Sequence, residues 1–289
     1  MKEMSKIEQK FSKKKKVISF EVFPLKKLEQ MDTLYATIDR LRRLSPDFIS
    51  VTYGAGGVGA ANTITADICA KIQNEYKTDS IAHLTCLHNS KQDIDFLLEK
   101  LNASGVKNIL ALRGDRNPDI PEKNDFKYAS DLVSYIMDKN MGFELSGACY
   151  PEVHPEAKNM AEDILNLKHK VDAGVGHLMT QLFFDNDTFY NFMEKVRAVG
   201  INVPVEAGIM PVTDKKQIEK MVAKCGASIP VKLAKVLQRF GDNSESMQKA
   251  GIEYAAKQIC GLMENGVDGV HIYTMNKPEI AEEILKAIR

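Results

Sequence analysis

An arginine, a glycine and an aspartate follow one another at Arg113, Gly114 and Asp115, directly after the apolar run Asn108–Leu112. An apolar run of this length is typical of a strand that is buried on both faces. Arginine binds anionic groups through a planar fork, and glycine lets a ligand approach the backbone. In parallel α/β folds, ligands bind at the carboxyl ends of the strands. The three residues therefore predict a ligand site at the end of this strand.

The same change from apolar to polar residues recurs at other predicted strand ends. It falls at Glu21, Thr52 and Tyr53, His83–Thr85, Tyr150–His154, Gln181, and Tyr273–Asn276. Each position alone has an ordinary explanation, such as an ion pair for Glu21, a hydrogen-bonded core histidine for His83 or a helix cap for Gln181. Because the ends of parallel strands meet on one face, we interpret the whole set as the lining of one site.

Eight strand-and-helix alternations position these residues. The predicted strands are Val17–Val22, Phe48–Tyr53, Ser80–Cys86, Asn108–Arg113, Phe143–Cys149, His177–Phe183, Val203–Ala207 and Gly269–Tyr273. Helices predicted between them include Asp32–Leu44, Asn62–Tyr76, Lys91–Asn102, Ala157–Ala173 and Thr188–Val199. This rhythm predicts a (β/α)8 TIM barrel as a single catalytic domain over residues 1–289. The stretch Asp214–Asn265 predicts an extra helix before the last strand, and residues 1–16 read as a mobile polar arm.

The composition favours small-molecule chemistry. The chain has 289 residues, is 27% charged and has a net charge of zero, so no field attracts nucleic acid or an anionic membrane. No segment approaches the roughly twenty apolar residues that span a bilayer, which predicts a cytoplasmic protein without a membrane partner. The five cysteines have no metal-binding spacing, so we expect reduced thiols and no metal site.

A glycine-rich segment offers an alternative. Gly54–Gly59 reads GAGGVG, which matches the G-x-G-x-x-G fingerprint of dinucleotide-binding folds. The following helix is predicted to begin near Asn62 or Thr63, too late for Gly59 to pack in its first turn, and eight evenly spaced units favour a closed barrel. A flexible loop at the barrel mouth is the simpler interpretation. The alternative function is a non-catalytic nucleotide-binding subunit or sensor that uses this loop.

Several phrases together resemble the methylenetetrahydrofolate reductases. They are ISFEVFP around Glu21, FISVTYGAGG from Phe48, AHLTC from Ala82, ALRGD ending at Asp115, YPEVHPEA from Tyr150, TQLFFD around Gln181, GIMPV from Gly208 and HIYTMN from His271. The likeness covers nearly the whole chain. It implies a barrel with FAD at the carboxyl ends of the strands, and reduction of 5,10-methylenetetrahydrofolate to 5-methyltetrahydrofolate with electrons from NADH or NADPH.

The resemblance also implies roles for individual residues. Glu21 is implied to be the general acid that helps open the five-membered ring of the folate, and Asp115 to lie between flavin and pterin. The implied substrate contacts are Asp115, Gln181, Gln217 and Lys277. The implied FAD contacts are Thr52, Tyr53, His83, Arg113, Gly114, Asp115, Tyr128, Ala129, Tyr150, His154, Ala157, Asp163, Asn166 and Lys170. A homo-oligomer is expected, with a redox partner protein as a further source of electrons.

Residue spacing supports part of this assignment. Asp163, Asn166 and Lys170 are spaced i, i+3 and i+7, so one helical face carries an acid, an amide and a cation suited to the hydroxyl and phosphate groups of FAD. A solvated face with an intrahelical ion pair is the alternative interpretation. The chain departs from the family pattern at His169 and Lys277, where arginines are expected, and at Met221, where an aromatic often lines the folate site. Neither lysine nor neutral histidine can make the bidentate fork of arginine.

Overall fold

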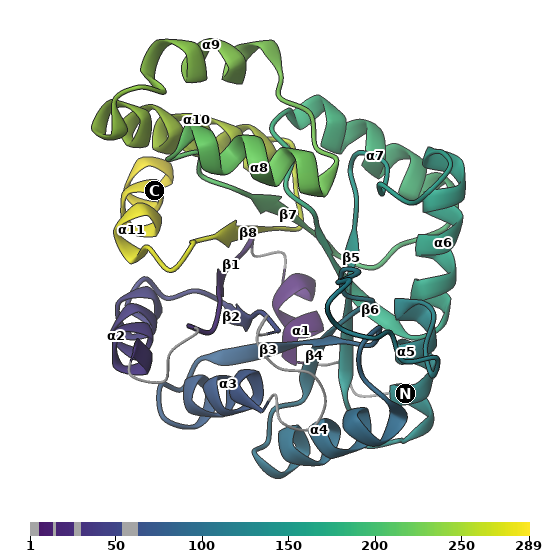
Figure 1. The fold of residues 1–289 in the computed structure, drawn as a ribbon. Helices are drawn as coiled ribbons and strands as arrows, with labels where there is room; N and C mark the ends of the chain where they lie inside the picture. The colour runs from purple at the N-terminus through teal and green to yellow at the C-terminus, as the bar shows by residue number, and fades with distance from the viewer. Residues whose placement is uncertain (1–5, 14–15, 26–29, 54–62) are drawn as a thin grey trace.

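Eight parallel strands form a closed barrel whose strand order is the chain order, so the predicted (β/α)8 barrel is confirmed (Figure 1). The computed structural model describes residues 6–13, 16–25, 30–53 and 63–289. The strands are β1 (Val17–Val22), β2 (Phe48–Val51), β3 (Asp79–Thr85), β4 (Asn108–Leu112), β5 (Glu144–Cys149), β6 (Val175–Thr180), β7 (Val205–Ile209) and β8 (Gly269–Tyr273).

Helices surround the strands. They are α1 (Lys6–Ser12), α2 (Met31–Arg42), α3 (Ile64–Asn74), α4 (Lys91–Ala103), α5 (Ala129–Asp138), α6 (Met160–Asp172), α7 (Asn186–Ala198), α8 (Lys215–Cys225), α9 (Val231–Phe240), α10 (Ser244–Glu264) and α11 (Pro278–Ile288). One helix per barrel step is the rule for this fold. Three helices, α8 to α10, separate β7 from β8, so the prediction of one extra helix is one helix short.

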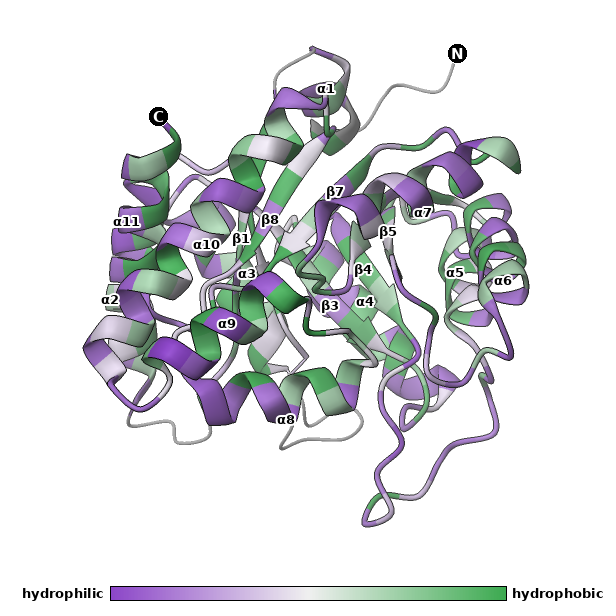
Figure 2. Cartoon of the chain, turned by 90° about the horizontal axis from the view of Figure 1, so that it is seen from above, coloured by the Kyte–Doolittle hydropathy of each residue, from purple (hydrophilic) through white to green (hydrophobic). Residues whose placement is uncertain are grey.

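The helices pack through apolar stripes. Figure 2 shows hydrophilic residues gathered on the outer faces of the helices. In α4 the buried positions are Ile94, Leu97, Leu98 and Leu101, which recur at helical spacing. The helix begins at a capping box in which the Ser90 hydroxyl accepts from the backbone N–H of Asp93, and the Asp93 carboxylate accepts from the backbone of Ser90. Such caps satisfy amides that the first turn leaves unpaired.

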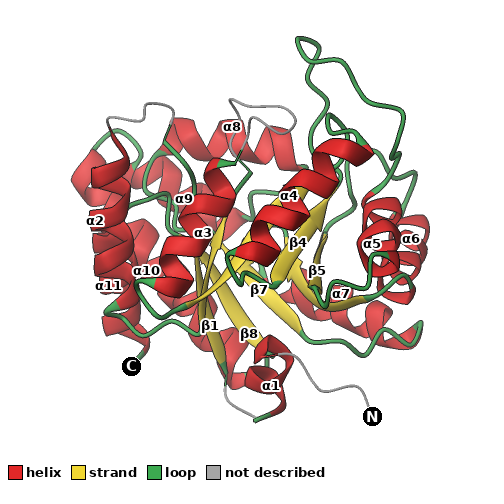
Figure 3. Cartoon of the chain, turned by 90° about the horizontal axis from the view of Figure 1, so that it is seen from below, coloured by secondary structure: helices red, strands yellow, loops and turns green. Residues whose placement is uncertain are grey.

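The N-terminal segment differs from its prediction. Residues 6–12 form α1, where the sequence favoured a polar arm. Ile7 is 3% exposed and packs with barrel residues that include Val17, Phe48 and Ile81, while Phe11 lies against the same cluster. Figures 2 and 3 both show α1 and α8 at opposite ends of the barrel. Two apolar residues among the lysines therefore suffice to seat a short helix on the amino-terminal end.

The interior of the barrel holds a cluster of buried polar side chains. Its members are Ser19, Ser50, His83, Ser146, His177, Glu206 and His271, each at most 6% exposed. Strands buried on both faces are usually apolar, and a buried polar group costs free energy unless it is hydrogen-bonded. Hydrogen bonds join Ser19 to Glu206 and His271, and Ser146 to His177, whereas Nε2 of His83 has no hydrogen-bond partner among the described residues. The cluster leads to the site described next.

Candidate active site

A cavity of about 740 Å³ opens at the carboxyl ends of the strands. Many of the sequence-predicted residues line it, namely Glu21, Thr52, Tyr53, His83, Arg113, Gly114, Asp115, Ala129, Tyr150, His154, Lys170 and Gln181. Its volume falls within the range of cofactor and small-molecule sites. The polar strand ends that the sequence grouped together therefore do converge on one place.

Glu21 lies near the end of β1, where it pairs in register with Ser50 of β2 and Tyr273 of β8. Its side chain is 19% exposed, and Oε2 lies 3.7 Å from the Nε2 atoms of both His83 and His271. Burial lowers the pKa of His83 to about 4, so this imidazole is neutral at physiological pH. A carboxyl group flanked by two imidazole nitrogens and open to a cavity can exchange a proton with a bound ligand.

Arg113 does not point freely into the cavity. Its guanidinium donates to both carboxylate oxygens of Glu156, at 2.6 and 2.5 Å. The hydrogen bond from Arg113 lowers the pKa of Glu156, and the same bond raises the pKa of Arg113. This fork fixes the orientation of the arginine, and a ligand phosphate could take the place of the carboxylate.

Gly114 has a backbone conformation that favours glycine. Its φ is +89°, and a Cβ added there would lie 3.1 Å from Cβ of Thr85. The neighbouring Asp115 carries an exposed carboxylate, with Oδ2 2.7 Å from Nζ of Lys224 on α8. The hydrogen bond that Lys224 donates to Asp115 raises the pKa of Lys224. Asp115 thus lies at the cavity rim, paired with a cation that the sequence analysis did not identify.

Lys170 has different surroundings from Asp163 and Asn166, with which the sequence grouped it on one helical face. Its Nζ donates to the backbone carbonyl of Ala148 at 2.7 Å, and burial lowers its pKa. The side chain lines the cavity, whereas Asn166 is exposed and does not. Asp163 accepts from the backbone N–H of His154 at 2.9 Å. The three residues share a helix but have different surroundings, because only Lys170 reaches inward past Gly147.

Aromatic and amide groups complete the walls. The rings of Tyr150 and His154 meet edge to face with centroids 4.5 Å apart, and burial raises the pKa of Tyr150 to about 12. Gln181 accepts from the backbone N–H of Leu182 through Oε1, and Tyr273 donates to the carbonyl of Thr180 at 2.7 Å. These bonds hold both side chains at the mouth of the barrel.

Some predicted site residues lie outside the cavity lining. They are Tyr128, Ala157, Asp163, Asn166, Gln217 and Lys277. Tyr128 is 52% exposed at the start of α5, and Lys277 is exposed at the start of α11. Their assigned contacts remain predictions. The segment Gly54–Gly59 lies outside the described residues, so the nucleotide-loop alternative also remains a prediction.

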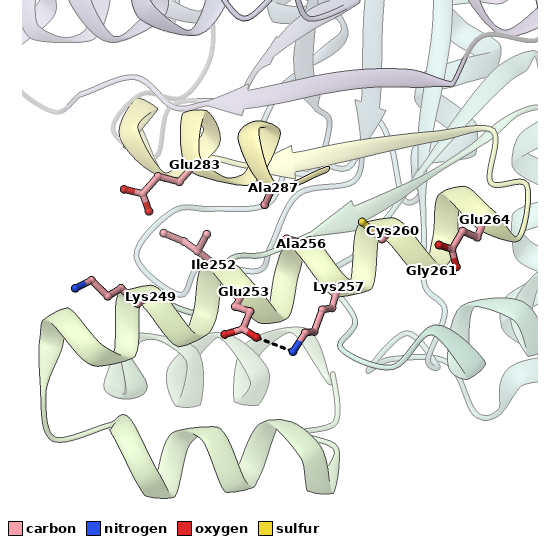
Figure 4. A pocket seen from close by; sticks show the side chains of 10 residues that line it. All are labelled: Lys249, Ile252, Glu253, Ala256, Lys257, Cys260, Gly261, Glu264, Glu283 and Ala287. Carbon is pink, nitrogen blue, oxygen red and sulfur yellow. Dashed lines mark hydrogen bonds and ion pairs between the residues drawn. The ribbon is translucent and has the colours of Figure 1, made fainter. Parts of the chain in front are cut away.

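A second hollow, of about 530 Å³, lies on the outer surface between α10 and α11. Figure 4 shows its side chains, with Ile252, Ala256 and Cys260 between the helices and Glu253 paired with Lys257 on the rim. None of the predicted site residues lines it. The barrel mouth is therefore the candidate site. Within the described ranges, no cluster of three metal-binding side chains occurs, and no helix is long and apolar enough to cross a membrane.

Comparison with known proteins agrees with this geometry. A family model described as methylenetetrahydrofolate reductase matches residues 6–289. The chain belongs to the methylenetetrahydrofolate reductase family. It is 36% identical to the 5,10-methylenetetrahydrofolate reductase of Escherichia coli over 267 residues, which cover 92% of this chain and 88% of that protein. It is 35% identical to methylenetetrahydrofolate reductase (NADH) 1 of Arabidopsis thaliana, of which it spans about half the length.

A solved structure shows the same fold. It is an uncharacterized protein from Clostridium thermocellum that binds two copies of 5-methyl-5,6,7,8-tetrahydrofolic acid. The two chains superpose with a TM-score of 0.66 at 18% identity, over 96% of each chain. The family resemblance seen in the sequence is confirmed by the family model and the bacterial relatives.

Sequence reasoning about the family motifs missed three contributors to the site. Glu156 lies within the quoted phrase YPEVHPEA, and His271 begins HIYTMN, so a search for charge partners of Arg113 and Glu21 could have selected them. Lys224 carries no comparable signal. It is one of several lysines on α8, and only the fold brings it to Asp115.

Proposed function

We propose that this protein catalyses the FAD-dependent reduction of 5,10-methylenetetrahydrofolate to 5-methyltetrahydrofolate, with NADH or NADPH as the electron donor. The observation that carries the proposal is the position of Glu21, a carboxyl group at the cavity with imidazole nitrogens 3.7 Å away on two sides. Family membership supports the choice of reaction. The reaction needs a proton donor as well as a hydride donor, and Glu21 is suited to be the former.

The cavity has the features that a flavin nucleotide requires. Nε2 of His83 is buried and has no hydrogen-bond partner in the described chain, so a ligand atom can satisfy it. Arg113 and Lys170 offer cations for the pyrophosphate, and the backbone at Gly114 allows close approach. Thr52, Tyr53 and Tyr150 offer hydroxyl groups. We propose that these residues hold FAD, which when bound supplies hydride transfer between the nicotinamide and the folate.

Glu21 acts as the general acid in this scheme. The departing amine of the methylene bridge is a poor leaving group until it is protonated, and a positioned acid contributes about 100- to 10,000-fold. The Thr274 hydroxyl donates to the backbone carbonyl of Glu21 at 2.6 Å, which fixes the end of β1. The partly buried position limits competition from water for the proton.

Asp115 and Gln181 bind and orient in the same scheme. A carboxylate at the rim can accept hydrogen bonds from the pterin amino groups once its ion pair with Lys224 opens. The amide of Gln181 offers both a donor and an acceptor at the cavity wall. We propose that it contacts the folate and, in the other half-reaction, the nicotinamide. A homo-oligomer in the cytoplasm, with electrons also accepted from a redox partner, completes the proposal.

An absorbance spectrum with anaerobic titration tests the function. Purified protein should bind added FAD, show a flavin spectrum, and bleach when NADH or NADPH is added without oxygen. Addition of methylenetetrahydrofolate should then restore the oxidised spectrum. A protein that binds no FAD, or whose bound flavin neither nicotinamide reduces, would overturn the proposal.

A further inference from the structure

Glu206 on β7 is a fully buried carboxylate within the barrel. Its Oε1 accepts from the hydroxyl of Ser19 at 2.9 Å, and its Oε2 lies 3.0 Å from Nε2 of His177. Neither Oε2 of Glu206 nor Nε2 of His177 has a hydrogen-bond partner in the described chain, so these two atoms are close without hydrogen-bond geometry. A carboxylate is retained in such a place only when its partners compensate for lost hydration. Glu206 lines neither of the cavities, so the proposed reaction does not use it directly.

A chain of contacts connects Glu206 to Glu21. Oγ of Ser19 lies 2.6 Å from Nδ1 of His271, and Nε2 of His271 lies 3.7 Å from Oε2 of Glu21. The strand register agrees, because Glu206 pairs with Gly269 on β8, four residues before Tyr273, and Tyr273 pairs with Glu21. The buried carboxylate therefore lies below the site, toward the amino-terminal end of the barrel.

The number of available protons fixes the direction of these bonds. The Ser19 hydroxyl has one proton, which it donates to Glu206, since a carboxylate can only accept. Its oxygen must therefore accept from Nδ1–H of His271. A neutral imidazole protonated at Nδ1 carries a lone pair at Nε2, and this atom faces Glu21.

The other groups around the His271 ring do not oppose this tautomer. Oγ of Ser50 lies 3.4 Å from Nε2, and because a hydroxyl can donate or accept, this contact fits either tautomer. The rings of Phe48 and Tyr273 lie at centroid distances of 6.4 and 5.3 Å and add no charge. His83, which also faces Glu21, is kept neutral by its burial. Glu21 and Glu206 are thus the carboxylates that act on this ring in the described chain.

We propose that Glu206 is a positioning residue, which acts through Ser19 to hold His271 as the Nδ1–H tautomer, with its Nε2 lone pair toward Glu21. This inference rests on the proposed function. A small rotation of the Glu21 side chain shortens the 3.7 Å separation to a hydrogen bond that Glu21 donates, which stabilises its protonated form. The opposite tautomer would point Nε2–H at Glu21 and stabilise the carboxylate instead. Glu206 therefore helps to keep the carboxyl group of Glu21 protonated.

Glu206→Gln should reverse the direction of the two hydrogen bonds that connect residue 206 to Ser19 and Ser19 to His271. Nε2 of His177 lies 3.0 Å from Oε2 of Glu206 without hydrogen-bond geometry, and Oγ of Ser146 lies 2.9 Å from Nδ1 of the same ring. In the variant, we expect the amide oxygen to face Nε2 of His177, the nearest ring nitrogen, and the amide NH₂ to face Ser19. The Ser19 oxygen then accepts from the amide and donates its proton to Nδ1 of His271. The His271 proton moves to Nε2, where it faces Glu21.

Nitrogen-15 NMR of histidine-labelled protein measures the tautomer without depending on turnover. The His271 signals, assigned by their loss in His271→Gln, should show Nδ1–H in the parent and Nε2–H in Glu206→Gln. With FAD and substrates, the alkaline limb of the folate half-reaction should move to lower pH in the variant. Its rate at pH 8 should fall about tenfold, with the nicotinamide half-reaction unchanged.

Two further variants keep the test decisive. Ser146→Ala changes only the far side of His177 and should leave the His271 signals at the parent positions. Ser19→Ala removes the link without changing charge and should give a mixture of tautomers, which decides the question if Glu206→Gln does not fold. The proposal would be overturned if His271 carries its proton on Nε2 in the parent, or if its tautomer is unchanged in both Glu206→Gln and Ser19→Ala. A tautomer switch in a protein without reductase activity would support the assignment and overturn the proposed function.

Discussion

Nζ of Lys224 lies 2.7 Å from Oδ2 of Asp115, so an ion pair joins α8 to the loop after β4 across the mouth of the cavity. Both side chains are more than 70% exposed. Exposed pairs contribute little to stability, and water or a ligand can replace either partner. The contact is therefore more important for access to Asp115 than for the fold.

We expect Lys224→Met to change the free energy of unfolding by less than about 1 kcal/mol. The KM for methylenetetrahydrofolate should fall, because the substrate no longer has to displace the lysine from Asp115. Urea unfolding and steady-state kinetics measure the two quantities. Lys257→Met removes a similarly exposed pair on α10 and is the matched control. A higher KM would instead show that Lys224 binds the substrate.

Asp115→Asn should keep the fold and bind FAD, because the side chain is exposed and its removal buries no charge. Both half-reactions should slow by at least about tenfold, because one carboxylate near the flavin and the pterin affects both transition states. Stopped-flow rates for flavin reduction and reoxidation measure the effect. Parent rates in both halves would make Asp115 a rim residue with no part in the chemistry.

The barrel itself was predictable from the sequence because strand and helix patterns alternate with even spacing. Strand ends were less predictable. The sequence favoured a strand over His177–Phe183, whereas β6 ends at Thr180. Phe183 is buried all the same, because its ring stacks on Phe189 at 5.4 Å beyond the strand. An apolar residue can be buried in a loop as well as in a strand, so hydrophobicity alone does not mark the boundary.

Site residues on strand ends were predictable because a parallel barrel collects those ends on one face. Partners from distant helices were not. Lys170 was expected on one helical face with Asp163 and Asn166, facing FAD or, in the alternative, solvent. Its separate inward path depends on Gly147, where an added Cβ would lie 2.9 Å from Cδ of the lysine. Such complementarity appears only when two elements are packed together.

Lys170→Met should weaken FAD binding by about tenfold or more, because it removes a poorly hydrated cation from the cavity wall. Turnover at saturating FAD should change much less. Titration of apoprotein with FAD, followed by fluorescence, gives the dissociation constant. Lys168→Met alters the same helix without reaching the cavity, and it should bind FAD like the parent. Equal affinities in the two variants would remove Lys170 from the cofactor site.

His83 should make stability depend on pH. Its folded pKa of about 4 lies below the ordinary histidine value of 6.5, because burial disfavours the charged form. The unfolded chain therefore binds the proton first as pH falls. The contribution of neutral His83 to the free energy of unfolding is complete above pH 6.5. It is lost as the pH falls from 6.5 to 4, and the loss is about 3 kcal/mol at most. Urea unfolding across this range should show a shallower loss for His83→Gln. If the free energy of unfolding depends on pH in the same way in the parent and in His83→Gln, the lowered pKa of His83 is contradicted.

Glu21→Gln should separate the two half-reactions. The variant keeps the size of the side chain but cannot donate an acidic proton, so the folate half-reaction should slow by about 100- to 10,000-fold. The nicotinamide half-reaction needs no such acid and should stay near the parent rate. Rapid mixing under anaerobic conditions gives both rates. Equal slowing of the two would indicate a disturbed cofactor site, and an unaffected folate half-reaction would exclude Glu21 as the acid.

The helix α1 has a consequence for how fast the barrel interior equilibrates with bulk water. Phe11 lies 4.8 Å from the ring of His177, which is 3% exposed, so the described part of α1 covers the amino-terminal side of this histidine. At the opposite end, a ligand that fills the cavity would cover Glu21. While that ligand is bound, the proton count of the buried carboxylates and imidazoles would be kinetically isolated. Their isotope exchange with solvent would then follow the residence time of the ligand.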